Sequence, residues 1–300
     1  MNRIKDEVLS GRLLVSDGAW GTFLHQKGLK PGECPENWNL TRPGDVLDIA
    51  TAYIRAGADM IETNSFGGNR FKLNRYGLDA KIKEINEAAA RISRQAAGEV
   101  KHVLGSIGPS GKILLLGDIS PEELYDVFRE QAEALEAGGA DSIIVETMSD
   151  LEEAVIAVKA AKENTMCEVI CTMTFEKTQG GEYRTMMGVS PSDIPLKLQE
   201  AGADIIGSNC GNGTRAMIEI TKELRSVAPD IPIIIQGNAG MPKYVKGNTV
   251  FEETPEETAG YVPDLIKAGA NIIGGCCGTT PEHIRLIVEI ISIVKKWPHP

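Results

Sequence analysis

A short segment that occurs four times constrains the fold of this chain more than any other feature of the sequence. In each copy, alanine and glycine precede a run of apolar residues, and the run ends on a polar residue or a cysteine. The copies cover residues 56–64, 138–146, 201–210 and 268–277. The glycine is where a helix would end, and the apolar run is too short for a new helix but suits a buried parallel strand. Each copy therefore predicts a helix end followed by a strand.

The spacing of the copies indicates how many strands the chain contains. Asp59, Asp141, Asp204 and Asn271 hold the same place in the four copies and are 82, 63 and 67 residues apart. A strand with its helix needs at least about 30 residues, so one further strand fits between successive copies. Apolar segments supply these additional strands: Leu13–Asp17, His102–Ser106, Val169–Met173 and Ile231–Gln236.

Eight strands that alternate with helices predict a (β/α)8 barrel, for which about 250 residues is typical. A doubly wound open sheet is the competing arrangement, but the Gly-x-Gly-x-x-Gly turn that would favour it is absent after the first strand. The repeat runs through 300 residues without a Ser/Pro linker or a low-complexity tract. We therefore expect a single barrel domain over residues 1–300, with its core at about 10–290.

Composition limits the classes of partner. The net charge of −11 and the pI near 5.0 argue against nucleic acid and against an anionic membrane surface, which both need a basic protein face. No run of 18 apolar residues is present, and the first seven residues are too polar for a secretion signal. We expect a cytoplasmic protein that acts on a small molecule or another protein, with its six cysteines reduced.

The strand ends are the first place to look for function, because the active sites of such barrels lie at the C-terminal ends of the strands. Asp17 ends the first strand before a run of small residues, which suits backbone contact with a ligand or, alternatively, a capped tight turn. Glu146 ends the fourth strand after largely apolar residues. Such a carboxylate needs a cationic or hydrogen-bonding partner; a substrate ammonium would serve, and capping of the next helix is the alternative.

Two long connections are candidates to cover the barrel mouth. One runs from Pro31 to Gly44, and the other runs from Gly237 to about Thr254. Ordinary connections need only a few residues, so both lengths indicate a further role. The second is a candidate lid.

Three cysteines come at the ends of two strands. Cys210 ends the sixth strand and Cys276 and Cys277 end the eighth, so the three thiols can meet across the seventh strand. Adjacent residues of a strand face opposite sides, so Cys276 and Cys277 can hold one ion only where the strand has ended and the backbone turns. Three cysteines without a nearby histidine suggest zinc held by thiolates.

Other interpretations of these thiols stay open on this evidence. A structural zinc site would need a fourth protein ligand, usually from a C-x2-C motif, which is absent; three ligands leave one position of the metal for a substrate. The alternatives are unreactive thiols beside the core, a vicinal redox pair with its strained ring, and a phosphate site at Gly274–Gly275.

The strand ends carry a distinctive combination of residues: DGAWGT at 17–22, ETNSF at 62–66, GP at 108–109, ET at 146–147, NC at 209–210, NAG at 238–240 and GGCCGTTP at 274–281. With these segments, and over about residues 10–290, the chain resembles the homocysteine S-methyltransferase family. Within the family it most resembles the homocysteine-binding barrel of cobalamin-dependent methionine synthase.

The resemblance implies a role for each matching position. The zinc ligands would be Cys210, Cys276 and Cys277. Asp17 and Glu146 would hold the amino group of homocysteine. The remaining members of the implied substrate site are the backbone at Gly18 and Ala19, which would hold the carboxylate, and the side chains of Asn64, Asn209 and Asn238.

The implied activity is zinc-dependent S-methyl transfer. A free thiol has a pKa near 8.5, whereas a zinc-bound thiol ionises outright, so homocysteine would attack a donor methyl group in line as a zinc thiolate and give methionine. The chain lacks a corrinoid-binding His motif. The resemblance implies a methylcorrinoid as the methyl donor, and without that motif in the chain it would be supplied by a separate protein or module.

Two alternatives and several departures from the family accompany this prediction. The chain could instead move a methyl group from a small methylated donor to a corrinoid protein or another thiol, or bind zinc and a thiol amino acid without catalysis. Gly237 stands where the family usually has proline, and Trp20 is bulkier than usual. Gly211 and Asn212 follow Cys210 where alanine or serine and then leucine are expected. These departures lie at strand ends and bear on the thiol acceptor and the donor.

Overall fold

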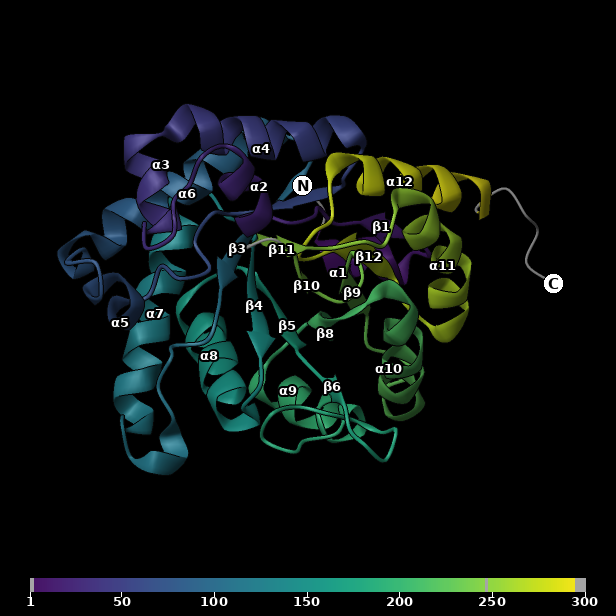
Figure 1. The fold of residues 1–300 in the computed structure, drawn as a ribbon. Coiled ribbons are helices and arrows are strands. Elements are labelled where there is room, and N and C mark those ends of the chain that lie inside the picture. The colour runs from purple at the N-terminus through teal and green to yellow at the C-terminus, as the bar shows by residue number, and fades with distance from the viewer. Residues whose placement is uncertain (1–2, 246–247, 295–300) are drawn as a thin grey trace.

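Eight parallel strands form a barrel in the computed structural model, which describes residues 3–245 and 248–294 (Figure 1). The strands are β1 (Leu14–Val15), β2 (Met60–Glu62), β3 (His102–Ile107), β4 (Ser142–Met148), β5 (Glu168–Met173), β8 (Ile205–Gly213), β9 (Ile233–Asn238) and β12 (Ile272–Gly275). The first strand, β1, pairs with the last, β12. This pairing confirms the predicted (β/α)8 barrel and excludes the open doubly wound sheet, in which the first and last strands stay apart.

Helices surround the barrel. The longer ones are α4 (Pro43–Ala56), α6 (Ile82–Ala97), α7 (Pro121–Ala137), α8 (Leu151–Asn164), α10 (Thr214–Val227), α11 (Pro255–Ala268) and α12 (Pro281–Val294). Shorter ones are α1 (Ile4–Leu9), α2 (Gly21–Gln26), α3 (Trp38–Thr41), α5 (Arg70–Asn74) and α9 (Pro195–Ala201). Two hairpins stand outside the barrel, β6 (Glu176–Lys177) with β7 (Tyr183–Arg184) and β10 (Lys243–Val245) with β11 (Asn248–Val250). Within the described ranges, none of these helices has the length and apolar character to cross a membrane.

The repeated segment ties each even-numbered barrel strand to the strand before it. Asp59 donates its backbone N–H to Val15 O at 2.7 Å and accepts from Val15 N with its carboxylate at 3.0 Å. The same two bonds join Asp141 to Val103, Asp204 to Val169 and Asn271 to Ile233. A basic side chain contacts each of these residues: Lys101 at Asp59, Arg94 at Asp141, Lys162 at Asp204 and Arg225 at Asn271. The repeat therefore stabilises the N-terminal end of the barrel.

This tie also closes the barrel. Every other pair of neighbouring strands in the described chain forms a ladder, whereas β1 and β2 do not. The two bonds between Val15 and Asp59 join these strands at one end. Glu62 N, which donates to the Asp17 carboxylate at 3.0 Å, joins them at the other. Two aspartates thus replace the missing ladder.

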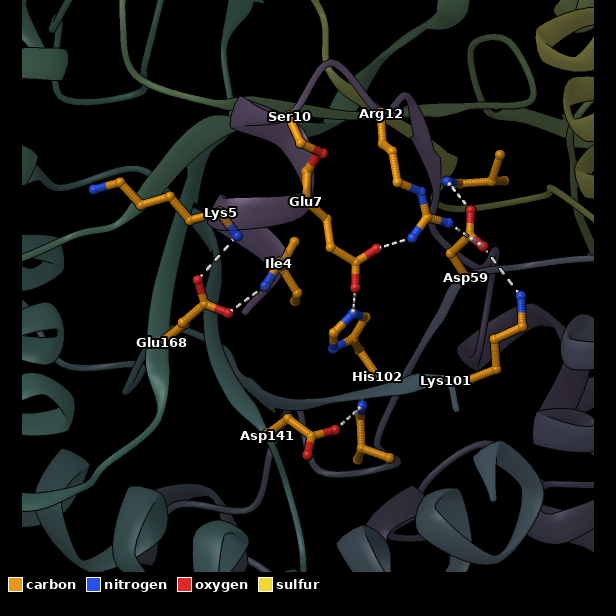
Figure 2. A network of polar contacts seen from close by, with 12 residues as sticks. Ile4, Lys5, Glu7, Ser10, Arg12, Asp59, Lys101, His102, Asp141 and Glu168 are labelled. Carbon is orange, nitrogen blue, oxygen red and sulfur yellow. Dashed lines mark hydrogen bonds and ion pairs between the residues drawn. The ribbon is translucent and has the colours of Figure 1, made fainter. Parts of the chain in front are cut away.

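Helix α1 seals the N-terminal end of the barrel. Ile4 and Val8 pack on a buried layer with one residue from each strand: Leu14, Met60, Leu104, Ile144, Ile170, Ile205, Ile234 and Ile272. Figure 2 shows the polar contacts around the helix, in which the Glu168 carboxylate accepts from the backbone N–H groups of Ile4 at 2.6 Å and Lys5 at 3.0 Å. Glu7 contacts both His102, at 3.1 Å, and Arg12.

The interior becomes polar one step further along the strands. Side chains on the same face of a strand recur every two residues. Two residues after the apolar layer, the inward positions are Ser16, Glu62, Ser106, Glu146, Thr172, Gly207, Gln236 and Gly274. Hydrogen bonds within this polar layer join Gln236 to Glu62 and Ser106 to Glu146. The polar layer forms the floor beneath the barrel mouth.

Candidate metal and substrate site

Three cysteines meet at the barrel mouth, as the sequence predicts. The sulfurs of Cys210, Cys276 and Cys277 all lie within 4.8 Å of one another, and Cys210 Sγ is 4.0 Å from Cys277 Sγ. Strand β12 ends at Gly275, so both later cysteines lie in the turn that follows it. The turn is fixed by Thr279, whose N–H and hydroxyl both donate to Cys276 O.

The backbone at Cys210 has an uncommon conformation. Its φ is +58°, in the left-handed region that costs a non-glycine residue about 1–3 kcal/mol. Gly211 follows with φ +69°, so two successive left-handed residues turn the chain at this point of β8. Strained residues of this kind persist where the surrounding structure holds them, and they concentrate at functional sites.

The donor set fits a soft divalent metal. At a Zn–S distance of about 2.3 Å, tetrahedral geometry places sulfurs about 3.8 Å apart, close to the 4.0 Å between Cys210 and Cys277. In the absence of metal, hydrogen bonds from Cys276 and Cys277 lower the pKa of the Cys210 thiol to about 3. The same bond to Cys210 raises the pKa of Cys277 to about 12. Three sulfurs this close together suit a soft divalent cation, which thiols bind with loss of their protons.

An acidic cavity of about 370 Å³ adjoins the cysteines. Its wall includes Glu62, Glu146 and Gln236 of the polar layer, Glu36, and the side chains of Trp20 and Phe66. None of the described residues that line it is Lys, Arg or His. The cavity therefore places carboxyl groups beside the thiols, where a cationic ligand group would complement them.

Glu146 lines this cavity. Its carboxylate accepts hydrogen bonds from Ser106 Oγ and, at Oε2, from Asn209 Nδ2 at 3.1 Å. Burial raises its pKa to about 7. Asn209 links the carboxylate to the cysteines, because the same Nδ2 lies 3.9 Å from Cys276 Sγ. Its Oδ1 accepts from Thr147 N and Thr172 Oγ1, both at 2.8 Å, which fixes the amide orientation.

Asp17 lies behind the cavity wall. It is fully buried and does not line the cavity. Its carboxylate accepts from Trp20 Nε1 at 2.9 Å, Glu62 N at 3.0 Å and Ser16 Oγ at 3.2 Å. Burial raises its pKa to about 6 despite these bonds. The predicted role of Asp17 at a substrate amino group stays a prediction.

The backbone at Gly18 and Ala19 does line the cavity. Gly18 has no room for a side chain, because a Cβ there would lie 2.7 Å from Thr279 Oγ1. The N–H of Ala19 already donates to Thr279 Oγ1 at 3.1 Å. Of the two peptide groups predicted to hold a carboxylate, the one at Ala19 is thus engaged within the protein.

The other two predicted asparagines differ in position. Asn64 lines the cavity, but its Nδ2 donates to Pro35 O at 2.8 Å and to Asn39 Oδ1 at 3.0 Å. Its amide therefore holds the connection of residues 31–44 in place. Asn238 is buried outside the cavity lining, and no hydrogen bond to its Oδ1 occurs in the described chain. The Asn238 side chain also contributes to the lowered pKa of Cys210.

Of the two connections predicted to cover the mouth, the first is the one whose described residues reach the cavity. Pro35 and Glu36 of the 31–44 connection line it. The predicted lid, from Gly237 to about Thr254, forms the β10–β11 hairpin, and its residues 246–247 lie outside the described ranges. In the described part of that segment, no residue lines the cavity.

Sequence reasoning gave Glu62 no role, yet it lines the cavity. Burial raises its pKa well above the ordinary value, and the neighbouring Glu146 and Asp17 raise it further. The period of two along β2 could have found it, since Glu62 lies two residues after the buried Met60.

The fold and the site define a class, a (β/α)8 barrel with a cluster of three thiols that could hold a metal ion beside an acidic cavity. The sequence profile of one family, homocysteine S-methyltransferase, matches residues 14–291, and the chain belongs to this family. It is 32% identical to methionine synthase of Mycobacterium tuberculosis over 97% of its length, and 32% identical to that of Mycobacterium leprae over 95%. The chain spans about a quarter of the length of these relatives.

Solved structures share the fold. The homocysteine methyltransferase MmuM from Escherichia coli, in its metallated form, superimposes with a TM-score of 0.78 at 22% identity, covering 95% of this chain and 99% of that one. Its apo form gives 0.73 at 23% identity, covering 93% and 95%.

Proposed function

We propose that this chain is a zinc-dependent methyltransferase that methylates the thiol of homocysteine to give methionine. The observation that carries the proposal is the convergence of Cys210, Cys276 and Cys277 at the edge of a cavity with carboxyl groups and, among its described lining residues, no cation. Membership of the homocysteine S-methyltransferase family supports the same substrate. We further propose that residues 1–300 act as one domain, because one barrel supplies every element of the site.

Cys210, Cys276 and Cys277 would hold the zinc, which would supply the Lewis acidity that keeps a substrate thiol ionised at neutral pH. The chain would orient the rest of the substrate. Glu146 faces the cavity and would bind the ammonium group, while Asn209 fixes that carboxylate relative to Cys276 through one amide nitrogen. The cavity walls at Trp20 and Phe66 would exclude water from the attacking sulfur.

For the methyl donor we propose a methylcorrinoid carried by a separate protein or module. The methionine synthases that the chain resembles are about four times as long, so other parts of those proteins have no counterpart in it. A donor of that size would have to approach from the barrel mouth, where the cysteines lie at the cavity edge.

The test combines metal analysis with three parallel assays. Zinc content is measured first, and homocysteine methylation is then assayed with methylcobalamin, S-methylmethionine and betaine. We expect Cys277→Ser to lose zinc and activity together. Cys167→Ala is the matched control, because Cys167 is a buried thiol that contacts Glu136 and Ala140 outside the cavity. An active Cys277→Ser variant without zinc would exclude the proposal.

A further inference from the structure

More carboxyl groups lie in and directly behind the cavity wall than one amino acid ligand is predicted to need. Asp17, Glu62 and Glu146 are 0%, 7% and 7% exposed, and no ion pair to any of them occurs in the described chain. Because an unpaired buried carboxylate costs several kcal/mol, a cationic ligand group is the natural partner for whichever of them faces the cavity. The hydrogen bonds of each carboxyl group determine which of its oxygens are available to a cationic ligand group.

Asp17 offers none at the cavity surface. Three donors surround its carboxylate, from Trp20, Glu62 and Ser16, and the residue has no exposed area. The indole of Trp20 adds to this enclosure, since it both lines the cavity and donates to Asp17 from that side. Asp17 is therefore held as part of the wall.

Glu62 has one oxygen free. Its Oε1 accepts from Gln236 Nε2 at 2.7 Å, and that amide nitrogen also contacts Ser16 Oγ at 3.3 Å. Its Oε2 makes no hydrogen bond in the part of the chain that the structure describes, and the residue lines the cavity. The side chain is thus fixed at one oxygen while the other is open to a ligand.

The barrel geometry places Glu62 and Glu146 together. They belong to β2 and β4, which flank β3, and they occupy the same polar layer of the interior. Both residues line the cavity, so the two carboxyl groups face the same space, with β3 and its Ser106 between their strands. The charge of Glu146 raises the pKa of Glu62, which agrees with this proximity.

We propose that Glu62, together with Glu146, receives the ammonium group of the substrate, and that Gln236 and Asp17 are positioning residues for Glu62. Gln236 fixes its Oε1, and Asp17 fixes its backbone N–H. This inference rests on the proposed function for the identity of the ligand. It differs from the prediction made from the sequence, in which Asp17 contacts the ammonium group directly.

The test compares two ligands that differ only in the amino group, homocysteine and 4-mercaptobutanoate. Their dissociation constants are measured by calorimetric titration of the zinc-loaded protein without a methyl donor. We expect Glu62→Gln to weaken homocysteine binding about 10- to 100-fold, the range of one hydrogen bond to a charged group, and to change 4-mercaptobutanoate binding less than about twofold. Zinc content should stay at the wild-type level.

A second variant serves if Glu62→Gln does not fold. Gln236→Met keeps the carboxyl group but removes its amide donor, and we expect about a three- to tenfold loss for homocysteine alone. The control is Glu168→Gln, a buried glutamate at the opposite end of the barrel, which should leave both dissociation constants unchanged.

The outcomes separate this inference from the function on which it rests. If the variants keep the wild-type preference for homocysteine over 4-mercaptobutanoate, Glu62 does not receive the ammonium group. If zinc-loaded wild-type protein binds neither thiol, the proposed function itself fails.

Discussion

Carboxyl groups occur at both ends of the barrel, but those of the repeat at the N-terminal end form ion pairs, whereas Asp17, Glu62 and Glu146 form none in the described chain. There, Asp59, Asp141 and Asp204 contact Lys101, Arg94 and Lys162, and each also accepts a backbone N–H group. At the C-terminal end, the carboxyl groups of Asp17, Glu62 and Glu146 have only neutral donors among the described residues.

This difference separates the parts of the barrel that maintain the fold from the parts available to a ligand. At the N-terminal end the charges are compensated within the chain, so substitution there should change stability. At the C-terminal end burial raises the pKa of all three carboxyl groups, so their negative charge is unfavourable until a cation arrives. Substitution of a carboxyl group at this end should weaken ligand binding. It should raise the stability of the ligand-free protein, whereas substitution at the N-terminal end should lower stability.

The largest effect on stability is expected at Asp204. Asp204→Ala removes the partner of Lys162 Nζ, at 2.6 Å, and leaves the buried Val169 N–H without its 3.0 Å acceptor. We expect the free energy of unfolding to fall by about 2–4 kcal/mol, measured by urea denaturation. Zinc and homocysteine binding by the folded variant should match the wild type.

Asp126→Ala is the control, since Asp126 pairs with Arg129 on an exposed helix face, where ion pairs contribute little. A selective loss of ligand affinity in Asp204→Ala would contradict the separation between the two ends.

Substitution of Glu146 is expected to raise the stability of the protein. The folded pKa of Glu146, about 7, lies above the unfolded value near 4.5, so the metal-free, ligand-free protein loses stability as pH rises between these values. Glu146→Gln cannot ionise and should be about 1–3 kcal/mol more stable than wild type at pH 8, by thermal unfolding across pH. The same variant should bind homocysteine about 10- to 100-fold more weakly and keep its zinc. If Glu146→Gln is less stable than wild type at pH 8, the negative charge of Glu146 is already stabilised by groups within the protein.

Much of the fold follows from the sequence because the repeat marks every second strand. Its aspartates were visible, but their function was not, since Asp59 accepts from Val15, which lies 44 residues earlier. Local patterns indicate where a strand begins. They do not show which neighbouring strand a side chain will join.

Some residues of the site could be predicted from the sequence, and others could not. The cysteines were found because the predicted ends of two strands bring three thiols together, and the family resemblance then selected zinc among the possible interpretations. Glu62 was overlooked although it lies in phase with Met60, and the enclosure of Asp17 depends on the indole of Trp20, three residues away in sequence. Side-chain hydrogen bonds of this kind are decided by packing, and a single sequence does not specify them.

The pH dependence of ligand binding tests the role of the carboxyl groups at the C-terminal end without any substitution. Protons on Glu146, with its pKa of about 7, compete with the ammonium group of a ligand. The affinity for homocysteine relative to 4-mercaptobutanoate should therefore fall about tenfold between pH 8 and pH 6, because one carboxyl group with that pKa goes from mostly ionised to mostly protonated. The thiol proton is lost by both ligands and cancels in the ratio. A ratio that is constant over this range would contradict ammonium recognition by these carboxyl groups.

The smallest effect is expected at Glu168, which holds helix α1 by two backbone N–H groups. Glu168→Gln keeps one acceptor oxygen and the size of the side chain, but it replaces the other oxygen with a donor that faces an N–H group. We expect the free energy of unfolding to fall by about 1 kcal/mol by urea denaturation, since at least one hydrogen bond is lost while Ile4 and Val8 stay packed on the apolar layer. Both thiol ligands should bind as in wild type. Weaker homocysteine binding would mean that the helix at one end influences the carboxyl groups at the other, and the two ends would then no longer be independent.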